Sequence, residues 1–352
     1  MTPPVVPRAA RDVECVAVLP GAVAEGLAEV TADLSALDGS GWWAVVLPFE
    51  GPPVCARFER VRRVAEGATP GPADRWTGPP TGAWSSSLGE AAFATRVEAI
   101  RTSIGAGDVY QVNLTRRVEA PLPAGASMVA LGGALGAANP APYAAVVDLP
   151  AAGVRLVSAS PELFLRRRGR RVRSAPIKGT APPGQPFTAK DRAENVMIVD
   201  LVRNDLGRVC EPGSVTVPGL LSEEPHPGLT HLVSTVEGVL RPDVGWPELL
   251  DATFPPGSVT GAPKLAALDH IRRLEPVRRG PYCGAVGWVD ADRREACLNV
   301  AIRTFWVEGD RLCLGTGGAI TWDSTAADEW AETELKAARL LAAASTADGA
   351  AG

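Results

Sequence analysis

The residues most suggestive of chemistry lie near the C-terminus, where Glu329, Glu332 and Lys336 follow at steps of three and four residues. On a helix this spacing puts the three side chains on one face, most commonly as a solvated row of ion pairs. The glycine-rich stretch 315–320 precedes them, and backbone N–H groups between a strand and a helix suit an anion. Carboxylates just beyond such a loop could hold a metal ion, and spacing alone leaves both interpretations open.

A second group of charges lies in a helix expected over residues 189–209. Glu194 precedes the apolar run 196–201, which contains Asp200. The run predicts burial of this helix on more than one face, and charges beside a buried run must be paired or used in a site. An internal ion-pair network and a functional site are equal alternatives here.

Lys178, Glu162 and Arg303 are three further charged residues, each with two interpretations. Lys178 is either a surface lysine or, in a closed cleft, an amine nucleophile with a lowered pKa. Glu162 lies in a surface turn or is a desolvated general acid. Arg303, expected in the middle of a strand among apolar residues, needs a carboxylate partner from the protein or from a substrate.

The elements expected around these residues indicate an α+β chain. Ser87 and Glu90 have capping-box spacing at the start of a helix that ends at Gly105. A strand follows over 109–118. Its alternation turns Gln111 and Asn113 to one face, which is either solvated or lines a polar cleft.

The C-terminal third contributes more strands and the last helix. Residues 282–320 are expected to form a three-strand meander with turns at 291–294 and 308–310, and the last helix to begin near Ser324 or Thr325. Runs of strands separated by helices favour α+β over a regular alternation of strand and helix.

Composition excludes several classes of function. The 352 residues are 46% hydrophobic and 21% charged, with a formal net charge of -5 and no basic tract, so we expect no nucleic-acid partner. Apolar runs are far shorter than the roughly 20 residues a membrane span requires, and the N-terminus lacks an apolar signal region. Six scattered cysteines without a C-x-x-C pair predict reduced thiols in a cytoplasmic protein.

Eight motifs, in one order over residues 88–341, resemble the chorismate-binding enzymes. They are AGDVYQVNL at 106–114, SPELF at 160–164, PIKGT at 176–180, KDRAENVMIVDLVRNDLGRV at 190–209, GSVTGAPK at 257–264, RGPYCGAVGW at 279–288, AIRT at 301–304 and GTGGAITWDSTAADEWAET at 315–333. The resemblance implies an α+β, two-lobed sandwich of antiparallel sheets with outer helices. Residues 1–85 would be an N-terminal region of the same fold, and residues 86–345 the catalytic domain.

The resemblance also implies a metal centre and carboxylate sites. Glu194 and Glu332 match the glutamates that bind Mg²⁺ in the family, and Glu329 matches one that supports the ion through water. The ring carboxylate of chorismate would lie by the metal and the backbone of Gly317 and Gly318. Arg303 and Tyr282 match the residues that hold the enolpyruvyl carboxylate, and His231 matches a histidine near the leaving hydroxyl.

The remaining matches concern catalysis and specificity. Glu162 matches the general acid-base residue, and Gln111, Thr180 and Lys336 are expected among the substrate-binding residues. Gln111 stands where the family's water-adding members have a lysine base. Because an amide cannot take a proton from water, we do not expect this chain to form isochorismate or salicylate. Lys178 stands where anthranilate synthases usually have alanine, and it resembles the lysine of members that aminate C4 through a covalent intermediate.

The resemblance therefore implies a magnesium-dependent amination of chorismate at C4, on the route to 4-aminobenzoate and folate. Ammonia would come from a separate glutamine amidotransferase subunit, because the chain has no recognisable glutaminase segment. Two alternatives are an anthranilate synthase component I and a silent paralogue that only binds chorismate. The second would be expected to lack residues such as Glu162 or Glu332, which are present.

Overall fold

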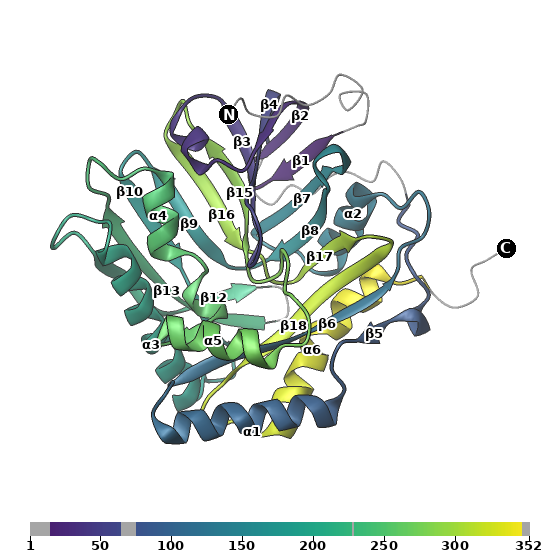
Figure 1. The fold of residues 1–352 in the computed structure, drawn as a ribbon, viewed down its shortest axis with the longest axis vertical. Coiled ribbons are helices and arrows are strands. Elements are labelled where there is room, and N and C mark those ends of the chain that lie inside the picture. The colour runs from purple at the N-terminus through teal and green to yellow at the C-terminus, as the bar shows by residue number, and fades with distance from the viewer. Residues whose placement is uncertain (1–14, 65–74, 227–228, 347–352) are drawn as a thin grey trace.

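The computed structural model describes residues 15–64, 75–226 and 229–346, which form strands and helices in mixed order (Figure 1). The helices are α1 (Glu90–Ala106), α2 (Met128–Ala138), α3 (Ala189–Gly207), α4 (Trp246–Thr253), α5 (Lys264–Leu274) and α6 (Ala326–Ala344). The strands are β1 (Val16–Leu19), β2 (Ala22–Thr31), β3 (Trp42–Leu47), β4 (Val54–Arg63), β5 (Ser85–Ser86), β6 (Gln111–Pro121), β7 (Tyr143–Leu149), β8 (Val154–Ser160), β9 (Leu163–Arg168), β10 (Arg171–Ala175), β11 (Ile177–Ala181), β12 (Thr216–His226), β13 (Leu229–Val239), β14 (Gly261–Ala262), β15 (Ala285–Asp290), β16 (Glu295–Val300), β17 (Thr304–Glu308) and β18 (Arg311–Ile320).

Every strand pairing between these elements is antiparallel. Pairing runs from β13 through β10, β9, β16, β15 and β3 to β4. It continues through β2, β1, β7, β8, β17 and β18 to β6. The expected α+β class is confirmed, with one continuous antiparallel ladder that the helices cover.

The two halves of this ladder pack against each other. Val45, Val286 and Leu298 come from β3, β15 and β16, and they belong to the same buried cluster as Val147 and Leu156 from β7 and β8. Because each sheet face is apolar, packing face to face removes both from water. The β2–β4 pairing closes the end of this sandwich.

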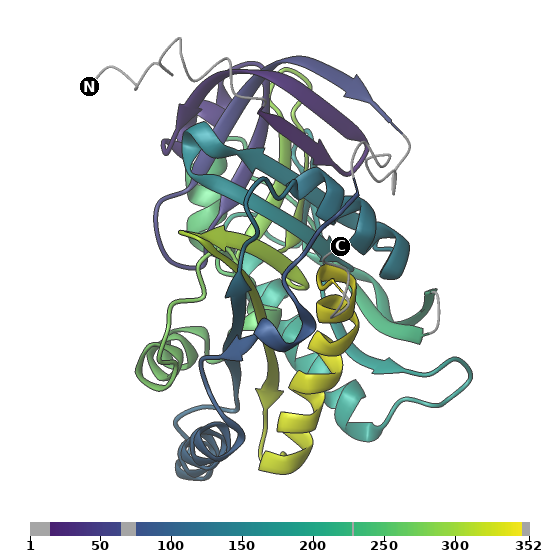
Figure 2. The same ribbon diagram turned by 90° about the vertical axis from the view of Figure 1, so that its right-hand side faces the viewer.

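Helices cover the outer faces of the ladder (Figures 1 and 2). Phe93 and Ile100 of α1 and Ile271 of α5 pack on Leu114 of β6 and Ile320 of β18. A separate cluster joins α2 and α6 to β7, β8, β17 and β18. Helix α3 lies along β11 and β13. The candidate site takes its residues from β6, β11 and β18 and from the helices α3 and α6 that pack beside them.

The N-terminal strands connect the two halves of the ladder. β1 pairs with β7, and β3 pairs with β15. Four strands of the region 1–85 are thus hydrogen-bonded into the same sheet as strands of the region 86–345. The division of the chain into those two regions stays a prediction.

The expected three-strand meander over 282–320 is wrong. The region holds four strands, and β17 pairs with β18 and β8 but not with β16. The chain leaves one half of the ladder after β16 and enters the other at β17. Arg303 lies at this crossing with φ 53°, and not in the middle of a strand as expected. Local alternation cannot show such a crossing, because it depends on which partner strand is nearest.

Two expectations about the helices are also corrected. Gly89, not Ser87, is the N-cap of α1, and the Ser87 hydroxyl accepts a hydrogen bond from the backbone N–H of Arg117. Helix α3 is not buried on more than one face, because Val196 is 46% exposed and Asp200 pairs with Arg203 at the surface. The N-cap of α6 is Thr325, one of the two residues expected there.

A buried ion pair ties α3 to α5. Lys264 Nζ lies 2.6 Å from Asp205 Oδ2, and the two side chains are 14% and 8% exposed. We expect Lys264→Met to lower the free energy of unfolding by about 3–5 kcal/mol, because it leaves the Asp205 carboxylate without its partner. Urea unfolding measures the change. The double variant with Asp205→Leu should recover most of the loss, and a single variant as stable as the parent would contradict the expectation.

Candidate functional site

The polar face of β6 is buried, which decides between the two interpretations of its alternation. Gln111, Asn113 and Thr115 are at most 7% exposed. Neither amide atom of Gln111 has a hydrogen-bond partner in the described part of the chain, and neither has the amide oxygen of Asn113. A buried polar group without a partner costs about 1–3 kcal/mol, so these amides are suited to a polar ligand.

Lys178 lies on β11 among carboxylates of three other segments. Its neighbours are Glu162, Glu194 and Glu332, and the ammonium of Lys336 is also close. Burial and Lys336 lower the pKa of Lys178, although the carboxylates act in the opposite direction. A lysine with a lowered pKa has a larger fraction of neutral amine, the nucleophilic form.

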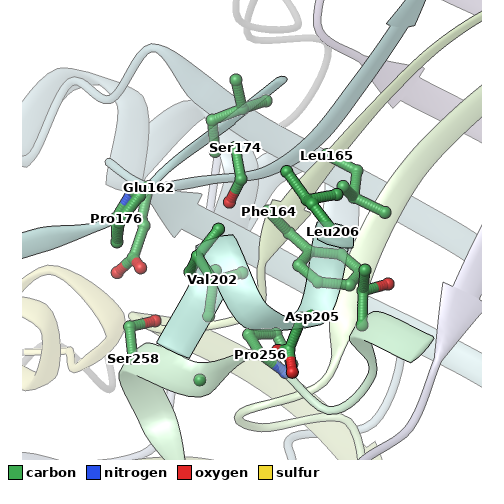
Figure 3. A pocket seen from close by; sticks show the side chains of 14 residues that line it. Glu162, Phe164, Leu165, Ser174, Pro176, Val202, Asp205, Leu206, Pro256 and Ser258 are labelled. Atoms are coloured by element: carbon green, nitrogen blue, oxygen red, sulfur yellow. The ribbon is translucent and has the colours of Figure 1, made fainter. Parts of the chain in front are cut away.

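Glu162 lies in the turn between β8 and β9 and is 3% exposed. Figure 3 shows its carboxyl group beside Ser258 at one end of a cavity. Burial raises the pKa of Glu162 to about 7, against the hydrogen bond from Ser258 and the positive charge of Lys178. An acid with that pKa exchanges protons readily near neutral pH, as general acid-base catalysis requires.

Three glutamates converge from α3 and α6. Lys190 lies 3.9 Å from Glu194 and 3.5 Å from Glu329, so it bridges the two helices. Lys336 lies 2.6 Å from Glu332 and donates to the backbone carbonyl of Gly317 at 3.0 Å. Burial favours the neutral form of Glu332, but the nearby charge of Lys336 acts in the opposite direction, and the pKa of Glu332 is lowered. We use the name carboxylate–lysine cluster for seven charged residues: Glu162, Lys178, Lys190, Glu194, Glu329, Glu332 and Lys336.

The chemistry of these donors fits a hard divalent cation. Glu329 is 2% exposed, and its Oε1 accepts from Ser324 at 2.5 Å, while its buried Oε2 has no hydrogen-bond partner among the described residues. A Cβ at position 318 would lie 2.8 Å from that free oxygen, so Gly318 keeps the space beside it open. Within the described ranges no group of three metal-ligating side chains is closed around one point. Mg²⁺ does not need one, because it keeps several waters and uses one or two carboxylates.

Some of the other expected site residues lie beside the carboxylate–lysine cluster, and others have no described contact with it. Thr180 Oγ1 lies 2.9 Å from His231 Nδ1 across the β11–β13 pair, two residues from Lys178. Arg303 faces Glu162, and burial lowers the pKa of the arginine against the opposing charge of that carboxylate. Tyr282 is buried against Gly315, where a Cβ would overlap its ring. Tyr282 and Gln111 have no described contact with the carboxylate–lysine cluster, so the roles expected for them stay predictions.

Sequence reasoning missed three residues of this region. Lys190 was part of a recognised motif, and its spacing of four from Glu194 was the available signal. Asn195 is buried and donates to the backbone carbonyl of Leu232 at 2.9 Å, which ties α3 to β13. Ser258 belongs to the motif at 257–264, but nothing local indicates that it faces Glu162.

Comparisons with known proteins place the chain among chorismate enzymes. The sequence model of the chorismate binding enzyme family matches residues 53–342. An anthranilate synthase component 1 of Haloarcula marismortui is 41% identical over 278 residues, which are 76% of this chain and 54% of that protein. An aminodeoxychorismate synthase component 1 of Klebsiella aerogenes is 40% identical over 274 residues, which are 74% of this chain and 59% of that protein.

The match with these relatives therefore spans little more than half of their own length. Among solved structures, the menaquinone-specific isochorismate synthase MenF of Escherichia coli superimposes with a TM-score of 0.80 over 94% of this chain and 88% of that chain. The sequence identity is 18%, so this likeness shows the fold alone. Separately, no helix in the described residues is long and apolar enough to cross a membrane.

Proposed function

Because the chain belongs to the chorismate-binding enzyme family, we propose that it aminates chorismate at C4 to form 4-amino-4-deoxychorismate, as a cytoplasmic enzyme of 4-aminobenzoate and folate synthesis. Ammonia would be supplied by a glutamine amidotransferase partner. Relatives named aminodeoxychorismate synthase component 1 support this activity at 40%, 38% and 37% identity. The assignment to C4 is the finer part of the proposal, and it rests on the residues of the site.

One observation carries the proposal: an amine with a lowered pKa lies among the charged groups of the candidate site. Lys178 is surrounded by Glu162, Glu194 and Glu332, and burial favours its neutral form. A surface lysine would be a poor nucleophile, because its amine is almost wholly protonated at neutral pH. The Lys178 environment supports covalent catalysis by this chain.

The proposed reaction has two displacements. The Lys178 amine forms a bond to ring C2, the two ring double bonds shift, and the C4 hydroxyl leaves as water with a proton from Glu162. Ammonia then forms a bond to C4, the double bonds shift back, and the C2–nitrogen bond to Lys178 breaks. Glu162, with a pKa of about 7, is able to give the first proton and to take one back.

Charged groups around the cluster would bind the substrate and the metal. Glu194 and Glu332 would hold Mg²⁺, with Glu329 next to it, and the ion would neutralise the ring carboxylate when bound. The Gly317 and Gly318 backbone would lie beside that carboxylate. Arg303 and Tyr282 would hold the enolpyruvyl carboxylate, and a guanidinium suits a bidentate contact. Gln111, Thr180, His231 and Lys336 would complete the substrate site.

Lys190 provides a test of the metal assignment that needs no substrate. Its ammonium lies by Glu194 and Glu329, where it repels a divalent cation. We expect Lys190→Gln to tighten Mg²⁺ binding about fivefold, since an exposed ion pair contributes up to about 1 kcal/mol. Titration calorimetry measures the change. Arg192→Gln removes the same charge from α3 and should leave Mg²⁺ affinity unchanged; equal gains in both variants would contradict the assignment.

A second candidate is anthranilate synthase component I, because a relative of that name is 41% identical. Product identification separates the two. The purified chain is incubated with chorismate, Mg²⁺ and ammonium at mildly alkaline pH, and the products are analysed by mass spectrometry. A C4-amino product that retains the enolpyruvyl group supports the proposal. Anthranilate with released pyruvate would assign the second candidate instead.

A further inference from the structure

Ser258 carries a buried hydroxyl that takes no part in the proposed reaction. It lies in the short 3₁₀ helix η5 (Gly257–Val259) and is 6% exposed. Ser258 and Glu162 line the same cavity, whose volume is about 20 Å³ (Figure 3). That volume takes a single water-sized molecule, so the Glu162 carboxyl has room to change its rotamer unless a contact holds it.

The loop that carries Ser258 is fixed on several sides. Thr260 donates from its hydroxyl to the backbone carbonyls of Pro256 and Gly257, both at 3.2 Å. Arg279 donates to the carbonyl of Val259 at 2.8 Å, and the N–H of Asn113 donates to that of Thr260 at 2.8 Å. These contacts hold the residues on both sides of Ser258, so its hydroxyl is presented to Glu162 from a rigid support.

The charged groups that face Glu162 come from several elements. Lys178 on β11 and Arg303 before β17 favour the ionised carboxylate, as does the backbone N–H of Ile177. Asp205 of α3 lines the same cavity and is neutralised by Lys264 of α5. Both nearby cations are expected to change partners when a dianionic substrate enters. Ser258 is neutral and anchored, so its contact with Glu162 does not depend on substrate.

We propose that Ser258 is a positioning residue for Glu162, which holds the carboxyl in one orientation at the wall of the cavity that both residues line. The inference rests on the proposed role of Glu162 as the acid. A hydroxyl that donates to a carboxylate stabilises the ionised form, so loss of the hydroxyl raises the pKa of the acid.

The direct test is a pH titration of Glu162 in the unliganded protein by infrared difference spectroscopy. The carboxylic C=O band is assigned by its loss in Glu162→Gln. We expect the midpoint to lie near 7 in the parent chain and about one pH unit higher in Ser258→Ala. Ser258→Thr, which keeps the hydroxyl, should restore a midpoint close to that of the parent.

Thr253→Val is the matched control, because Thr253 lines the same cavity but donates its hydroxyl to the carbonyl of Leu249 at 2.7 Å. Its midpoint should equal that of the parent. An unchanged midpoint in Ser258→Ala, or an equal shift in Thr253→Val, would overturn the inference. The titration needs no turnover, so its outcome is independent of the product assay that tests the proposed function.

Discussion

Replacement of Lys178 by alanine is expected to lower C4 amination by roughly 10³-fold or more. The proposed route depends on the bond between this amine and ring C2, and removal of a nucleophile abolishes the whole covalent path. Single-turnover kinetics with ammonium and Mg²⁺ in excess measure the effect. Because the amine acts in the bond-forming step and not in binding, the loss should appear in kcat more than in the chorismate KM.

Two further variants distinguish the role of Lys178 as a nucleophile from an effect of its positive charge. Lys178→Arg keeps the positive charge but has no nucleophilic amine at neutral pH, so it should be as inactive as Lys178→Ala. Arg192→Lys exchanges one cation for another on α3 outside the cluster, where Arg192 pairs with Glu223, and should retain the parent turnover. Amination in Lys178→Arg at a rate near that of the parent would show that Lys178 acts by charge alone.

Glu162→Gln is expected to lower turnover by about 10²–10⁴-fold, the usual contribution of a positioned general acid. Glutamine keeps the shape of the side chain and its place in the cavity but cannot give a proton. The effect is measured as kcat/KM for chorismate at constant free ammonia. Ser174→Ala, which changes another residue of the cavity wall, is the control and should keep the parent rate within a few fold.

The same residue predicts a pH dependence. Burial raises the pKa of Glu162 to about 7. The C4 hydroxyl of the substrate can leave as water only when Glu162 is protonated. The rate of the first displacement should therefore fall as pH rises through about 7. Glu162→Gln should lose this limb of the profile together with its activity. A parent profile that stays flat across this range would argue against Glu162 as the acid.

Local sequence patterns could not predict the proposed metal site, although they indicated the glutamates of α3 and those of α6 separately. The α6 stripe of Glu329, Glu332 and Lys336 follows from a spacing that any helix imposes. The stripe becomes a candidate metal site only because α3 lies against it, with Lys190 Nζ 3.5 Å from Glu329 Oε1. More than a hundred residues separate the two helices in sequence, and the packing of α3 on β11 and β13 and of α6 on β18 brings them together.

The sequence by itself determined the periodic features of this protein. These include the α+β class and the start of α6, which the sequence placed at Ser324 or Thr325 and which lies at Thr325, because both depend on backbone geometry over a few residues. Its motifs also identified the family. It determined which residues of β6 share a face, but tertiary packing decided that Gln111 and Asn113 are buried there. Packing also decided that Arg303 lies at a crossing with φ 53° and that Ser258 meets Glu162. Burial and contacts between distant segments depend on which strands pair, and strand pairing is a property of the whole sheet.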